Sequence, residues 1–152
     1  MGWMNGSMKD SDQEKQYFPE GTKHEEVLKT IGNRDFVWDE AKNKHNLKVH
    51  HVDFETAMFV FNDLNRIEIY DESHSEDEDR WNTIGKAMDH HENSLDAMKG
   101  TGPKLTLGKV RGLLFVVYTD RIIMGREMIR LISARRATKF EEMLYINRES
   151  DF

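Results

Sequence analysis

Residues 35–61 read DFVWDEAKNKHNLKVHHVDFETAMFVF and hold the clearest structural signals of the chain. Phe36–Trp38 is a short apolar run typical of a strand. Asp39 is suited to cap a short polar helix over 40–48, because its side chain can accept a backbone N–H bond. Asp53 is suited to cap a second helix, in which apolar residues at helical spacing predict a core-facing side: Phe54, Ala57, Met58 and Phe61.

Outward from this stretch, the pattern predicts a sheet flanked by helices. One or two helical turns are expected over Thr22–Arg34, ending at Gly32-Asn33. Strands and a closing helix are expected downstream; the strands cover 66–70, 80–87, 105–110, 113–119 and 128–133, and the helix covers 139–148. Because strands and helices are segregated along the chain, the predicted fold class is α+β with a mainly antiparallel sheet.

The chain of 152 residues fits one domain with its own core. Residues 1–34 are interpreted as a flexible, partly helical leader, and 35–152 as the folded domain. Residues 87–111 are interpreted as an insertion, since Thr83–Lys86 (TIGK) recurs as Thr106–Lys109 (TLGK).

Composition excludes several classes of function. There are 22 Lys+Arg against 28 Asp+Glu, a net charge of −6, and no Cys. Without Cys there is no disulfide framework, thiolate zinc site or cysteine nucleophile. The absence of Cys is also compatible with a protein of the reducing cytosol. No apolar run approaches the ~20 residues of a membrane span, and no signal peptide is evident, so a cytoplasmic protein without a membrane partner is expected. Acidic residues concentrate in 71–79 and basic ones in 121–139, so a basic groove remains compatible with the net charge.

A series of motifs occurs in order along the chain: Phe36–Lys42 (FVWDEAK), Asn46-Leu47 with His50, Val52–Ala57 (VDFETA), the Asp71/His74/Glu78/Arg80 signature followed by Thr83–Gly85, Leu113–Thr119 (LLFVVYT) and Ile129–Thr138 (IRLISARRAT). Together they resemble the BrnT family of bacterial toxins, the ribonuclease component of the BrnT–BrnA type II toxin–antitoxin system. The resemblance runs from about Phe36 to Arg148. It implies a fold similar to that of RelE-type toxins, a small antiparallel sheet with N-terminal helices and a C-terminal helix packed on it.

The resemblance also implies a function. It predicts a metal-independent, cofactor-free endoribonuclease that cleaves RNA to inhibit translation and is neutralised by a BrnA-like antitoxin. Promoter DNA would be bound only through the antitoxin, and a heterotetramer with the antitoxin is compatible with the family. The alternative is a catalytically silent domain that binds protein or RNA. His51 stands where the family usually has Gly and Val49 where it usually has a basic residue, and these departures favour the alternative.

Cleavage of RNA without a metal requires a base for the 2′-hydroxyl, cations for the phosphorane and an acid for the leaving oxygen. The candidate catalytic residues are His74, Glu78, Arg80, Arg135 and Arg136, and the candidate RNA-binding residues are Lys42, His50, Arg130 and Lys139. Imidazole titrates near neutral pH and guanidinium donates to phosphate in bidentate fashion. Glu78 could instead orient Arg80.

Several of these residues also have simpler interpretations. Arg135 and Arg136 could form ion pairs with the acidic loop, and His74 could be solvated. Trp38 and Trp81 are interpreted as packing residues, while Ser133 and Thr138 are expected to bond the backbone at a strand end or helix cap. His90-His91-Glu92 is a weak metal signal without a third ligand fixed by spacing, so no metal site is assigned.

Overall fold

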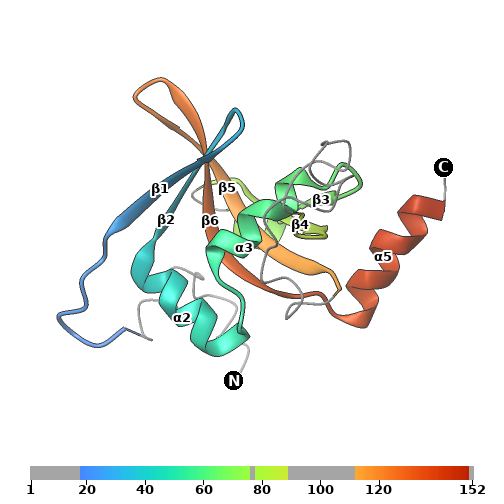
Figure 1. Cartoon of the computed structure of the whole chain (residues 1–152), viewed down its shortest axis with the longest axis horizontal. Helices are drawn as coiled ribbons and strands as arrows, with labels where there is room; N and C mark the ends of the chain where they lie inside the picture. The colour runs from blue at the N-terminus through green and yellow to red at the C-terminus, as the bar shows by residue number, and fades with distance from the viewer. Residues whose placement is uncertain (1–17, 76–77, 89–111, 151–152) are drawn as a thin grey trace, which may run out of the picture.

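A computed structural model describes residues 18–75, 78–88 and 112–150 of the protein. Figure 1 shows a twisted sheet with helices on it. The strands are β1 (Glu26–Ile31), β2 (Arg34–Asp39), β3 (Ile67–Tyr70), β4 (Arg80–Gly85), β5 (Leu114–Ile123) and β6 (Arg126–Arg136). The α-helices are α2 (Glu40–His50), α3 (Phe54–Met58) and α5 (Lys139–Ser150), and the 3-10 turns are η2 (Phe59–Asn62) and η3 (Glu72–His74).

The sheet has six strands in the order β1-β2-β6-β5-β4-β3 and is mixed. The segment Asp35–Val37 of β2 pairs in parallel with Met128–Arg130 of β6, whereas the other neighbouring pairs are antiparallel. The α+β class with a mainly antiparallel sheet is therefore confirmed, but the fully antiparallel sheet that the family resemblance implies is wrong at this one pair. The parallel pairing could not be predicted because β2 and β6 are far apart in the sequence. The pattern of residues within one strand does not indicate which distant strand it pairs with or in which direction.

The helical turns expected over 22–34 are also wrong, because Glu26–Ile31 forms the edge strand β1 and pairs with β2 through a turn at Gly32. Val27 and Ile31 pack against the core from this strand. A spacing of four residues places two side chains on one face of a helix and equally on one face of a strand. Pairing with β2 satisfies the backbone of β1, so the strand forms.

The helices of the opening stretch are confirmed together with their caps. The Ala41 N–H donates to Asp39 Oδ1 (3.0 Å), and the Thr56 N–H donates to Asp53 Oδ1 (2.7 Å). The apolar residues that follow Asp53 are all buried: Phe54, Ala57, Met58 and Phe61. The downstream strands and closing helix are likewise present, although the strand expected over 105–110 lies outside the described residues.

The two faces of the sheet are covered unequally. On the first face, α3 and η2 close the main core around Phe36, Trp38 and Leu131. The second face carries a smaller cluster in which Leu144 and Tyr145 of α5 pack on β3 and β4. Trp38 is buried and Trp81 packs against the main core, as predicted for both.

One side chain attaches α2 to the edge of β6. Beyond Arg130, β6 no longer pairs with β2, and Asn46 of α2 takes the vacated place. Asn46 Nδ2 donates to the carbonyls of Ala134 (2.7 Å) and Val52 (2.8 Å), and the Ala134 N–H donates to Asn46 Oδ1 (3.1 Å). The amide thus replaces the peptide group of a neighbouring strand, and it fixes the helix beside the sheet edge.

His51 ends α2 in the left-handed region with φ 61°, and its N–H donates to the Leu47 carbonyl at 2.9 Å. This is the position at which the family resemblance leads one to expect Gly. A side chain there carries a steric cost that glycine avoids.

Candidate functional site

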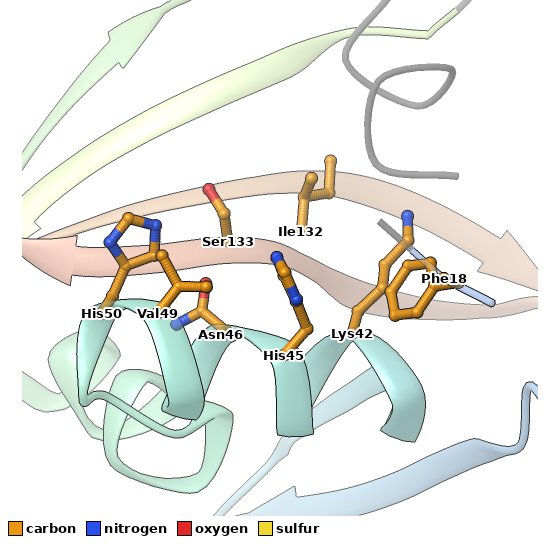
Figure 2. A pocket seen from close by; sticks show the side chains of 8 residues that line it. All are labelled: Phe18, Lys42, His45, Asn46, Val49, His50, Ile132 and Ser133. Atoms are coloured by element: carbon orange, nitrogen blue, oxygen red, sulfur yellow. The ribbon is translucent and has the colours of Figure 1, made fainter. Parts of the chain in front are cut away.

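A groove with a volume of about 300 Å³ opens between α2 and β6. Figure 2 shows the side chains of α2 standing along it, with Ile132 and Ser133 of β6 behind them. They follow the spacing of one helical face, and the lining from α2 is Lys42, His45, Asn46, Val49 and His50. Phe18 completes one end. The candidate RNA-binding residues Lys42 and His50 therefore share one groove.

His50 has a pKa below its ordinary value of 6.5. Burial is the main cause, followed by the positive charges of Arg135, His45 and His51. Both effects disfavour the imidazolium form. At neutral pH His50 is therefore a neutral imidazole that can accept a proton.

Arg135, on β6, is held in place from two sides. Its guanidinium lies over the Phe115 ring at 4.1 Å from the centroid, and it pairs with Glu141 in bidentate fashion at 2.8 and 3.0 Å. Burial alone would raise the pKa of Glu141, but the bonds from Arg135 and Thr138 and the charge of Arg135 lower it overall. The arginine next to His50 is thus a preorganised cation.

The partner of Arg135 belongs to the first turn of α5. The Thr138 N–H donates to Glu141 Oε1 (2.8 Å), and the Glu141 N–H donates to Thr138 Oγ1 (3.2 Å), which makes a capping box. Farther along α5, the Tyr145 hydroxyl donates to the buried Asp63 Oδ2 at 2.8 Å. The position of Arg135 therefore depends on how α5 is attached, and Thr138 has the capping role expected of it.

The acidic signature forms a separate cluster. His74 Nδ1 lies 2.9 Å from Asp71 Oδ2, and Glu78 pairs with Arg121 at 2.9 Å. Burial would raise the pKa of Asp71, but the bonds from Ser73 and His74 lower it. Glu78 was expected to act in catalysis or to orient Arg80, and the structure bonds it to Arg121.

Arg80 and Arg135 lie apart along the sheet, on the two strands that flank β5. Arg80 is buried at the start of β4 opposite Thr119, whereas Arg135 lies opposite Phe115, four residues away along β5. At the usual rise per residue this is about 13 Å along the strands. The structure therefore does not join His74, Glu78 and Arg80 to Arg135 in one site, and the charge of Arg135 acts on His50 instead.

The remaining predicted cations, Arg130, Arg136 and Lys139, lie on β6 and at the start of α5. Arg130 pairs with Glu26 of β1 at 2.7 Å, and Arg126 at the start of β6 pairs with Asp35. Arg136 and Lys139 are exposed where β6 leads into α5. The arginines at 121, 126, 130 and 135 thus each bond a carboxylate, and that of Arg135 comes from α5 rather than from the acidic loop.

Three residues at the site are not among those predicted from the sequence: His45, Glu141 and Phe18. His45 could have been predicted from the sequence, since it lies three residues after Lys42 and five before His50 on a predicted helix. Glu141 could also have been predicted, because it is the third residue after Thr138 in a capping-box pattern. No sequence pattern indicates Phe18 as a site residue, because its neighbours in space are not its neighbours in sequence.

Within the described ranges, no group of three or more His, Asp or Glu side chains is arranged to hold a metal. The described helices also include none that is long and apolar enough to cross a membrane. The His90-His91-Glu92 signal lies outside the residues that the structure describes.

The chain forms a small α+β protein whose groove brings Lys42, His45 and His50 together, and the positive charge of Arg135 acts on His50. Residues 38–92 match the family model described as "Ribonuclease toxin, BrnT, of type II toxin-antitoxin system". The match confirms, over this part of the chain, the resemblance to the BrnT family that the motifs indicate. The segment includes Lys42, His45 and His50, whereas Arg135 and α5 follow it. No curated protein matches the chain.

Proposed function

We propose that this protein is an endoribonuclease toxin that cuts RNA in the groove between α2 and β6 and thereby inhibits translation. The observation that carries the proposal is that Lys42, His45 and His50 line one groove, while the positive charge of Arg135, fixed by Glu141, acts on His50. The family match supports ribonuclease activity independently of this geometry.

The proposed reaction uses Lys42, His45 and His50 of the groove together with Arg135 of β6. His50 accepts the proton of the 2′-hydroxyl, the 2′-oxygen forms a bond to phosphorus, and the bond from phosphorus to O5′ breaks. Arg135 stabilises the charge that develops on the phosphorane, and Lys42 binds the same phosphate. His45, which interacts electrostatically with His50, supplies the proton to O5′. The products are a 2′,3′-cyclic phosphate and a 5′-hydroxyl, and no metal takes part.

The proposal includes a protein partner. The description of the matched family refers to a type II toxin–antitoxin system, so an antitoxin is implied for this chain. We propose that a BrnA-like antitoxin neutralises the toxin in the cytoplasm, that a heterotetramer forms, and that promoter DNA is bound through the antitoxin.

The second candidate function is an RNA- or protein-binding domain that does not cut. One observation favours it: the Arg135 guanidinium is already bonded to both oxygens of Glu141. A phosphate must therefore share or replace the Glu141 carboxylate. The two candidates differ in whether bound RNA stays intact.

Incubation of the purified protein with 5′-labelled single-stranded RNA in EDTA distinguishes them. We expect fragments ending in a 2′,3′-cyclic phosphate, because the 2′-oxygen is the nucleophile and a histidine is the base. A substrate with 2′-deoxyribose at the scissile nucleotide is the matched control and should stay intact. Uncut RNA after incubation with folded protein that binds it would support the silent domain instead.

A further inference from the structure

A second cavity of about 520 Å³ adjoins the groove on the outer side of α2. The segment 18–25 forms one wall, and the other wall is the helical face of Ala41, Lys44, His45 and Lys48. Phe18 and His45 line both cavities, so the groove and this second cavity meet at these two side chains. Figure 2 shows Phe18 beside Lys42 at the end of the groove.

The second cavity carries the charge that a phosphate backbone needs. Lys23, Lys44 and Lys48 line it, against the two carboxylates of Glu25 and Glu40. The Glu40 carboxylate already accepts bonds from Trp38 Nε1 (3.3 Å) and Asn43 Nδ2 (2.8 Å), so it is engaged within the protein. In a chain with a net charge of −6, this excess of lysine is a local exception.

An aromatic ring stands at the junction of the two cavities. Phe18 contacts the His24 and His45 rings edge to face, with centroids 5.1 and 5.7 Å away. These contacts hold the ring at the point where the groove and the second cavity meet. Lysines along a path, together with an aromatic ring that stacks a base, are how proteins bind single-stranded nucleic acid without reading its sequence.

We propose that the second cavity is a subsite for a neighbouring nucleotide of single-stranded RNA. The base stacks on Phe18, and its phosphate is bound by Lys44 and Lys48, while the scissile phosphate lies in the groove at His50. The inference rests on the proposed function in taking RNA as the ligand. Phe18 precedes the family-matched residues 38–92, whereas Lys44 and Lys48 lie within them, so the subsite combines the matched segment with the residues before it.

The test measures binding of 2′-O-methyl oligouridylates, which lack the 2′-hydroxyl nucleophile and cannot be cut. We expect the wild-type protein to bind a tetranucleotide more tightly than a dinucleotide. Phe18→Leu keeps an apolar side chain but removes the stacking ring, so it should weaken tetranucleotide binding about tenfold and weaken dinucleotide binding much less. Phe18→Trp should retain the affinity. Lys48→Gln should flatten the dependence of log K on log salt by about 0.7 for the phosphate contact it loses.

Phe140→Ala is the matched control, because Phe140 is an exposed aromatic residue (71% exposed) on α5, outside both cavities. Equal tetranucleotide affinity in the wild-type, Phe18→Leu and Phe140→Ala proteins would overturn the subsite. If such a protein still cuts RNA, the subsite alone is wrong. If binding depends on Phe18 but RNA stays intact, the proposed cleavage activity alone is wrong. If the wild-type protein binds no oligonucleotide, both the cleavage activity and the subsite are wrong.

Discussion

Replacing Asn46 by Ala is expected to destabilise the fold by about 4 kcal/mol, because three hydrogen bonds are lost in a buried place. The substitution leaves the Ala134 N–H, the Ala134 carbonyl and the Val52 carbonyl without the partner they have now. Each unsatisfied group costs about 1–3 kcal/mol. The total is a large part of the ~5–15 kcal/mol that stabilises a typical domain. Urea unfolding measures the loss.

Asn43→Ala is the matched control, since Asn43 is the same residue type on the same helix. Its side chain accepts one backbone bond, from the Phe54 N–H at 2.7 Å, and donates one to the Glu40 side chain at 2.8 Å, so its loss should cost about 1–2 kcal/mol. Asn46→Asp should resemble Asn46→Ala, because a carboxylate cannot donate to the two carbonyls. Equal stabilities of the Asn43→Ala and Asn46→Ala variants would show that the amide does not attach α2 to the sheet.

Replacing Arg135 by Ala is expected to reduce RNA cleavage by about 10²–10³-fold, the usual effect of removing one preorganised donor from a developing oxyanion. A second readout follows from the charge of Arg135, which is among the causes that lower the pKa of His50. In the Arg135→Ala variant the pKa of His50 should rise toward 6.5, and NMR titration of the imidazole measures this.

Arg121→Ala is the control for Arg135, because Arg121 is also a carboxylate-paired arginine of the sheet but pairs with Glu78 in the acidic cluster. It should keep most of the cleavage rate and leave the titration of His50 unchanged. A larger loss in Arg121→Ala than in Arg135→Ala would place the reaction in the acidic cluster.

Local features of the fold could be predicted from the sequence, and long-range neighbours could not. Asp39 and Asp53 predict their helices correctly because a cap and the apolar spacing after it act within a few residues. The strand at 26–31 and the parallel pairing of β2 with β6 depend on contacts between distant segments. Neither leaves a signal in the spacing of the residues themselves.

The same distinction applies to the site. The sequence predicts Lys42 and His50 as RNA-binding residues. Their spacing along α2 places both side chains on the helical face that lines one groove. Arg135 was selected with His74, Glu78 and Arg80, but the register of β4, β5 and β6 separates them. A motif gives the order of its residues along the chain, whereas the register and the position of α5 decide which of them meet.

The central claim is that His50 accepts the proton in RNA cleavage. The most direct test is the single-turnover cleavage rate in EDTA as a function of pH, for the wild-type and His50→Ala proteins. With a base whose pKa lies below 6.5, the wild-type rate should rise with pH through that pKa and then level off, since only the neutral imidazole is active. His50→Ala should abolish this rise and lower the plateau about 10²–10⁴-fold. An unchanged profile at full rate in folded His50→Ala, or its loss in His74→Ala instead, would contradict the account.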